Sequence, residues 1–158
     1  MTSRDEALQT IQQLSPTLGL SDLTRVVLKV IRDQVGADRG TIFIVDRKKG
    51  EIRSVVADRV VGGISLPIGI GIAGSVAENG QTIDTSNPQY DERFDDKYEP
   101  ILKYDTKDIF CMAMKNPAGD IVGVLELLNR TRPFDQDDLA FLHRIVDSLG
   151  PVLEKTQV

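Results

Sequence analysis

The sequence predicts an α+β fold, in which helices from both chain ends cover one face of a mainly antiparallel sheet of about six strands. Near the two ends, apolar residues recur with the spacing of amphipathic helices. Between residues 41 and 129, short apolar runs separated by turn-forming residues favour strands joined as hairpins. The length of 158 residues suits one domain, so we expect a single domain over 1–158 with its core over about 5–155.

Two helices are expected at the N-terminus. Ser3 and Glu6 match the capping-box pattern of a helix start. This helix should stop at Ser15-Pro16, because proline lacks the N–H that a helix interior needs. A second helix is expected from near Ser21, whose side chain is suited to cap it. Gly36 is suited to end it, since glycine adopts the left-handed conformation without a steric penalty.

The central segments are expected to form the sheet. Six strands are predicted, at residues 41–45, 52–57, 64–68, 81–84, 109–115 and 121–129. A short helix over about 72–78 should separate the third strand from the fourth. Asp135 is a suitable cap for a long C-terminal helix, which Gly150-Pro151 should bend.

Residues 85–106 form a polar, turn-rich segment without a strong regular pattern. Stretches of this kind are uncommon inside compact domains and are usually functional loops such as lids. We therefore expect 85–106 to cover a binding site. The carboxylates at positions 91, 92, 95 and 96 lack the glycine and the spacing of a calcium-binding loop, so we expect them to be solvated.

The composition excludes several classes of chemistry. A single cysteine and a single histidine exclude a disulfide framework, a multi-cysteine zinc site and His-rich metal centres. We expect Cys111 to be a small buried hydrophobic residue and His143, at the border of a helical apolar stripe, to have no catalytic or metal role. The net charge of −5 argues against nucleic-acid binding, which calls for a basic surface.

The sequence pattern also argues against targeting and membrane-spanning segments. The charged N-terminus is not followed by an apolar signal core. The uncharged stretch 60–77 holds five glycines and a proline, and its isoleucines alternate as on a half-buried strand. We therefore expect a soluble, cytoplasmic protein.

Residues 69–74 read Gly-Ile-Gly-Ile-Ala-Gly, which matches the G-x-G-x-x-G fingerprint of dinucleotide-binding folds. The context does not fit that fold, because Pro67 lies in the preceding strand and the remaining chain is too short for several more βαβ units. We interpret the motif as a tight turn into a short helix. The N–H groups at the start of such a helix are still suited to an anionic ligand.

Glu126 is a candidate binding residue. In the strand 121–129 it shares a face with Val124 and Leu128. A carboxylate on an apolar face must be paired, hydrogen-bonded or neutralised, because an unpaired buried charge is costly. Two interpretations stay open: a salt bridge to a neighbouring Lys or Arg, and a pocket carboxylate that accepts a hydrogen bond from a ligand.

Four motifs occur in order along the chain. They are Gly71-Ile72-Ala73-Gly74, Pro88…Asp91-x-Arg93-Phe94, Asp108-Ile109-Phe110-Cys111-Met112 and Gly123-Val124-Leu125-Glu126-Leu127-Leu128-Asn129-Arg130. Over about residues 5–155 the chain resembles the GAF domain family, and most of all the regulatory domains of cyclic nucleotide phosphodiesterases and adenylyl cyclases. The resemblance implies a six-stranded antiparallel sheet, with the terminal helices on one face and a ligand pocket on the other, roofed by 85–106.

The resemblance also implies a ligand and its binding residues. The positions used by cyclic-nucleotide-binding members match Asp58, Ile72, Ala73, Thr106 and Glu126 of this sequence. A cyclic nucleotide, cAMP or cGMP, is therefore the candidate ligand, and no cofactor is required. Leu102 departs from the pattern, since a second polar residue is expected there, and no arginine obviously meets the phosphate.

A phosphodiesterase-type signature resembles Asn129-Arg130…Phe134…Asp138. Arg130 stands where lysine is usual, and Leu139 where glutamate is usual. In the family, the lysine of this signature forms an ion pair with the first aspartate of the signature. Arg130 and Asp138 occupy these two positions here, so the resemblance implies an ion pair between them. Bilin-binding relatives attach pigment through a cysteine followed by histidine, which Cys111-Met112 does not match, and methionine sulfoxide reductase relatives need several cysteines.

Together these features predict a non-enzymatic, small-molecule-sensing domain of a signalling protein, in which ordering of 85–106 over a ligand is relayed through the terminal helices. The alternatives are a sensor of another small molecule and a ligand-free structural dimerisation module. The apolar stripe of the last helix motivates homodimerisation through the terminal helices. An output domain is expected outside this segment.

Overall fold

The computed structural model describes residues 2–57, 63–94 and 106–155. Its helices are α1 (Ser3–Leu14), α2 (Leu20–Ile31), the π-helical turn Arg32–Gly36, α3 (Gly71–Asn79), the 3-10 turn Pro88–Tyr90 and α4 (Gln136–Glu154). Its strands are β1 (Ala37–Asp46), β2 (Glu51–Ala57), β3 (Ser65–Pro67), β4 (Ile83–Ser86), β5 (Asp108–Lys115) and β6 (Ile121–Arg130). All six predicted strands and the four main helices are present.

The strands form one six-stranded sheet in the order β3-β2-β1-β6-β5-β4, and every neighbouring pair is antiparallel. The predicted α+β fold is therefore confirmed. The short strands β3 and β4 form the two edges. Pro67 lies in edge strand β3, where the missing N–H of proline is tolerated.

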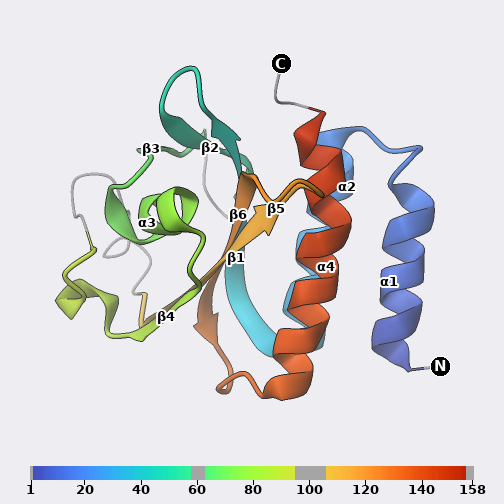
Figure 1. Ribbon diagram of the computed structural model, residues 1–158. Helices are drawn as coiled ribbons and strands as arrows, with labels where there is room; N and C mark the ends of the chain where they lie inside the picture. The colour runs from blue at the N-terminus through green and yellow to red at the C-terminus, as the bar shows by residue number, and fades with distance from the viewer. Residues whose placement is uncertain (1, 58–62, 95–105, 156–158) are drawn as a thin grey trace.

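Two apolar clusters lie on opposite faces of this sheet. The larger joins α1, α2 and α4 to one face and includes Leu8, Ile31, Phe110, Leu127 and Leu142; we call it the helix-side cluster. The smaller joins α3 to the other face and includes Phe43, Ile72, Ala73, Cys111 and Val124; we call it the α3-side cluster. Figure 1 shows this layering, with α4, α2 and α1 on one side of the sheet and α3 on the other.

The N-terminal caps differ from the prediction. Thr2, not Ser3, caps α1: its side chain accepts a hydrogen bond from the Asp5 N–H, and the Asp5 carboxylate accepts one from the Thr2 N–H. Helix α2 begins one residue before Ser21, and Gly19 stands at its cap without a side-chain hydrogen bond. Both corrections have one cause, since the cap is the last extended residue, which the sequence pattern places only to within a residue or two.

Most other element ends are close to their predicted places, but β1 begins at Ala37, four residues before the predicted start at residue 41. Helix α1 ends before Ser15-Pro16. Gly36, with a left-handed φ of 79°, is the last residue of the π-helical turn that follows α2. Strand β4 begins two residues later than predicted. Asp135 caps α4 through a capping box with Asp138, and α4 runs on through Pro151 to Glu154. The bend expected at Gly150-Pro151 stays a prediction.

The segment 85–106 is described only in part. Its start carries the end of β4 and the 3-10 turn, and Phe94 packs against the α3-side cluster. Residues 95–105 lie outside the described residues, so the expected cover over a ligand stays a prediction. Within the described part of the chain, no helix is both long and apolar enough to span a membrane.

Candidate ligand-binding face

Glu126 lies in the middle of the sheet, on the face covered by α3. In register it stands opposite Thr41 of β1 on one side and Cys111 of β5 on the other. Val124 and Leu128, two residues away in either direction, both belong to or pack on the α3-side cluster. The predicted placement of Glu126 on an apolar strand face is therefore confirmed.

The carboxyl group of Glu126 has an unusual environment. The Cys111 Sγ lies 3.6 Å from Glu126 Oε2, at the distance of a weak S–H hydrogen bond. Burial raises the pKa of Glu126 to about 7, and the contact with the Cys111 thiol opposes that rise only in part. Among the described residues no Lys or Arg forms an ion pair with Glu126, so this part of the chain does not provide the salt bridge of the first interpretation.

The start of α3 lies over the same face. Ile72 and Ala73 are fully buried in the α3-side cluster, together with Cys111 and Val124. Helix α3 contacts β5 and β6, the strands that carry Cys111 and Glu126. The structure thus places Ile72, Ala73 and Glu126 on one side of the sheet, as predicted.

The glycine-rich stretch before α3 is a tight turn, as predicted. The Gly69 N–H donates to the Gly74 carbonyl over 2.8 Å, and Gly69 and Gly71 have φ of 88° and 77°. A Cβ on Gly74 would lie 2.6 Å from the Pro67 carbonyl oxygen, so only glycine allows this approach. The cap residue Ile70 has no side-chain acceptor, which leaves the positive end of the helix dipole without a carboxylate or hydroxyl from its own cap.

Thr106 and Asp58 complete the predicted set. Thr106 is 7% exposed, and its Oγ1 is buried without a hydrogen-bond partner among the described residues. Buried hydroxyls are normally paired, so this oxygen is suited to a partner from a ligand. The described contacts do not join Thr106 to Glu126 or to α3. Asp58 lies outside the described residues, and its predicted role stays a prediction.

The sequence did not identify Thr41 and Cys111 as neighbours of the candidate site. Thr41 is 4% exposed and Cys111 is fully buried. Both were placed correctly in strands, but only the register of β1, β5 and β6 sets them beside Glu126. The apolar pattern fixes the face that each residue takes, but shifts of two residues keep the same face, so the exact partners depend on pairing across the sheet.

The ion pair implied between Arg130 and Asp138 is wrong. The Arg130 guanidinium instead binds Asp84 at 2.6 Å and Asp108 at 3.0 Å. Asp138 is fully buried and accepts hydrogen bonds from Arg132, from Arg4 at 2.6 Å and from the Asp135 N–H. Burial opposes ionisation of Asp138, but these donors together lower its pKa well below the usual range.

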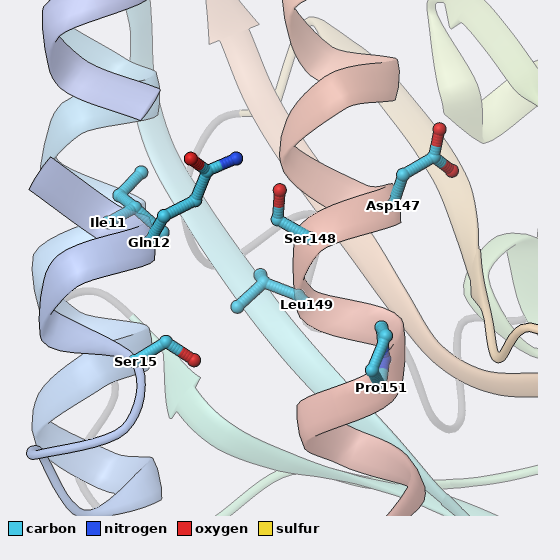
Figure 2. Close-up of a pocket in the computed structure, with 7 residues that line it drawn as sticks. All are labelled: Ile11, Gln12, Ser15, Asp147, Ser148, Leu149 and Pro151. Atoms are coloured by element: carbon cyan, nitrogen blue, oxygen red, sulfur yellow. The ribbon is translucent and has the colours of Figure 1, made fainter. Parts of the chain in front are cut away.

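A surface groove lies elsewhere, between α1 and α4. It has a volume of about 250 Å³ and is lined by Ile11, Gln12, Ser15, Asp147, Ser148, Leu149 and Pro151. Figure 2 shows Gln12 of α1 and Ser148 of α4 pointing into the space between the two helices, and Asp147 pointing away from α1. The lining is mixed, with apolar side chains beside amide, hydroxyl and carboxylate groups, which suits a packing surface better than a small-molecule pocket.

Comparisons with known proteins agree with this fold. The sequence model of the GAF domain family matches residues 19–153. The chain is 28% identical, over 98% of its length, to the dual 3',5'-cyclic-AMP and -GMP phosphodiesterase 11A of Takifugu rubripes, and 27% identical, over 96% of its length, to a cGMP-specific 3',5'-cyclic phosphodiesterase of Drosophila sechellia. It spans only 19% and 14% of these relatives' lengths.

A solved structure shows the same architecture. The GAF domain from an Acinetobacter phosphoenolpyruvate-protein phosphotransferase superposes with a TM-score of 0.79 at 18% sequence identity, covering 99% of this chain and 96% of that one. At this identity the likeness concerns the fold alone. The family is shown by the sequence model, which matches residues 19–153 and therefore most of the chain. The chain thus belongs to the GAF family of regulatory sensor domains.

Proposed function

We propose that this GAF domain binds a cyclic nucleotide on the α3 side of the sheet and that binding regulates an output domain elsewhere in a cytoplasmic signalling protein. Glu126 would contact the purine base, the backbone at Ile72 and Ala73 the phosphate, and Thr106 a further polar group. The domain itself would have no catalytic role. Two relatives support the ligand part of this proposal, since their names specify cyclic AMP and cyclic GMP, or cyclic GMP alone, as substrates. The chain matches less than one fifth of each relative, which is why we propose that the output domain lies elsewhere.

The observation that carries the proposal is the carboxyl group of Glu126. It lies on the apolar α3-side face, and among the described residues it has only a thiol as hydrogen-bond partner. A desolvated carboxyl with unused hydrogen-bonding capacity lowers stability, and a ligand that supplies donors would remove this penalty. The N–H groups that open α3 on the same face favour an anion. A purine joined to a phosphate provides both chemistries.

Calorimetric titration with cAMP and with cGMP tests the proposal. We expect heat of binding with at least one of them, and a large loss of affinity in Glu126→Ala, since removing one partner of a buried hydrogen bond costs about 1–3 kcal/mol. Glu6→Gln, which changes an exposed glutamate on α1, is the matched control and should bind normally. If neither nucleotide binds the wild-type domain, the proposal fails in favour of another small molecule or of a ligand-free structural module.

We also propose that two copies associate through α1 and α4. These helices run parallel, because Arg4 meets Asp138 near their first turns and the groove joins Ser15 to Ser148 and Pro151 near their ends (Figure 1). A groove of mixed polarity between two parallel helices is suited to accept side chains from a second α1–α4 pair.

Sedimentation at micromolar concentration tests the association. The wild-type domain should be dimeric, and Ser148→Arg, which places a long charged side chain in the groove, should be monomeric. Lys48→Glu, at the exposed hairpin turn between β1 and β2, is a control that should leave the dimer intact. A monomeric wild-type domain would remove the dimer from the proposal but would not affect ligand binding.

A further inference from the structure

Arg130 holds two strands together at the end of the sheet where β4 and β5 meet. Its guanidinium makes a bidentate contact with Asp84 of β4, at 2.6 and 3.0 Å, and its Nε lies 3.0 Å from Asp108 Oδ1 at the start of β5. The Arg130 N–H also donates to Asp108. The side chain is only 10% exposed, and bidentate, partly buried Arg–carboxylate pairs are among the stronger ion pairs.

The left-handed backbone of Asn129 sets the direction of the Arg130 side chain. By strict strand alternation Arg130 would share the α3 side with Leu128. Asn129 has φ of 56°, which breaks the alternation. The Arg130 guanidinium accordingly lies 4.9 Å from the centre of the Phe134 ring, which packs on Phe110 in the helix-side cluster. Arg130 therefore contacts the sheet from the face opposite to Glu126.

Backbone contacts strengthen the same corner. The Asn129 side chain accepts a hydrogen bond from the Lys107 N–H at 2.7 Å, and the Lys107 carbonyl accepts one from the Asn87 N–H at 2.8 Å. These bonds tie together the residue after β4, the residue before β5 and the end of β6. Both arms of the connection between β4 and β5 are thus fixed where they leave the sheet.

Strand β4 needs such support. It is four residues long, lies at the sheet edge and pairs only with β5. A short edge strand is held by few backbone hydrogen bonds and opens readily. Yet Ile83 of β4 lies opposite Cys111, whose thiol contacts Glu126. The position of β4 therefore determines whether Ile83 packs beside Cys111 and Glu126 on the candidate ligand face.

Arg130 can bind Asp84 and Asp108 because other arginines pair with Asp138. Arg132 and Arg4 both bind the Asp138 carboxylate. We propose that Arg130 is a positioning residue, which clamps β4 against β5 and thereby keeps Cys111 and Glu126 covered and aligned for the ligand. Its effect on ligand affinity rests on the proposed function, whereas its effect on β4 does not.

The single cysteine provides a direct test. Cys111 is fully buried and stands opposite Ile83 in register, so opening of β4 should expose its thiol to a chromogenic aromatic disulfide. In Arg130→Lys, which keeps the charge but loses the bidentate fork, we expect labelling to accelerate by roughly tenfold or more. Arg47→Lys, on the exposed hairpin turn, is the matched control. Ile145→Val, in the helix-side cluster, controls for a general loss of stability.

The second measurement is the affinity of the same variants for cAMP and cGMP. Faster labelling of Arg130→Lys than of both controls, together with weaker nucleotide binding, supports the clamp. Labelling at the rate of Ile145→Val would refute it, and faster labelling with unchanged affinity would refute the positioning role. If the wild-type domain binds neither nucleotide, the proposed function fails, and the labelling rates still decide whether Arg130 clamps β4.

Discussion

Glu126 is the residue at which burial and charge conflict most strongly. Its neighbours in the sheet are Thr41 and Cys111, and burial raises its pKa to about 7. A carboxyl group whose pKa is higher in the folded than in the unfolded state binds more protons when folded. Its contribution to stability is therefore present at low pH and is lost as the pH rises from about 4.5 to about 7.

We predict that Glu126→Gln removes this pH dependence. The rise in the pKa from 4.5 to about 7 corresponds to a penalty on the order of 3 kcal/mol for the ionised form. Relative to wild type, the variant should gain stability between about pH 5 and about pH 8, because the amide cannot ionise. Urea unfolding at the two pH values measures the difference. A constant difference between the two proteins would contradict the raised pKa.

A second prediction concerns ligand preference and rests on the proposed function. A protonated Glu126 offers a donor and an acceptor, which complements the N6–H and N1 edge of adenine. An ionised Glu126 offers only acceptors, which complements the N1–H and N2–H donors of guanine. We expect the preference for cGMP over cAMP to increase roughly five- to tenfold between about pH 6 and about pH 8, since one hydrogen bond contributes about 1 kcal/mol.

Calorimetric titration of both nucleotides at the two pH values measures this preference. Glu126→Gln is the matched control, because its amide offers a donor and an acceptor at every pH. Its preference should not change with pH. A wild-type preference that is equally insensitive to pH would show that Glu126 does not contact the purine edge.

At the residue scale, the sequence predicted what each strand determines by itself. Alternation placed Glu126 on the apolar face and buried Cys111. It did not predict the contact between them, which depends on the register of two strands. Nor did it predict the partners of Arg130, because the left-handed conformation of Asn129 redirects that side chain.

At the scale of elements, α1 depends on a few polar contacts. It lies outside the region matched by the family, which begins at residue 19. Leu8 and Ile11 bury its apolar side. Arg4 adds hydrogen bonds to Asp138 at 2.6 Å and to the Gln34 carbonyl at 2.7 Å, and it stacks over Phe141.

We predict that Arg4→Ala loosens α1 selectively. The change removes one of two arginines from the fully buried Asp138, which should cost about 1–3 kcal/mol. Hydrogen exchange should accelerate in α1 but not in α2. The control is Arg144→Ala, whose ion pair with Asp5 is exposed and should contribute less than about 1 kcal/mol. Exchange in α1 that is as slow in Arg4→Ala as in the wild type would show that Arg4 does not hold the helix.

Helix α4 approaches the end of β5 closely at Gly150. A Cβ at this position would lie 1.8 Å from the carbonyl oxygen of Lys115 at the end of β5. The obstacle is backbone, so it cannot rotate away. We predict that Gly150→Ala displaces α4 and destabilises the domain by about 1–3 kcal/mol or more, measured by chemical denaturation. Gly19→Ala has open space around it and should cost no more than about 1 kcal/mol.

The order and type of elements were predictable because each helix and strand has its own period of apolar residues. The caps of α1 and α2 were not, since Thr2 and Ser3 both have side chains able to cap. The π-helical turn Arg32–Gly36 was not predicted either, because the spacing of apolar residues indicates a helix without distinguishing a π-helical last turn from an α-helical one.

At the scale of the whole molecule, one sheet supports two cores. Strands β1, β5 and β6 contribute alternate residues to both, so that Ile42, Phe110 and Leu125 belong to the helix-side cluster, and Phe43, Cys111 and Val124 to the α3-side cluster. Neither core can be lost without exposing the sheet that carries the other. We propose that the shared sheet could relay a change on the α3 side to the terminal helices.

This shared sheet predicts cooperative unfolding. Ile145→Val on the helix side should cost about 0.5–1.5 kcal/mol, and Val124→Ala on the α3 side about 2 kcal/mol. Both should lower one common Tm by roughly 2–4 °C per kcal/mol. Far-UV circular dichroism, which follows the backbone, and near-UV signals from the buried Phe43 and Phe110, one in each core, should coincide in both variants. If Val124→Ala instead melted in two steps, with the helices unfolding later, the two cores would be independent, and the sheet would not couple a ligand on the α3 side to α1 and α4.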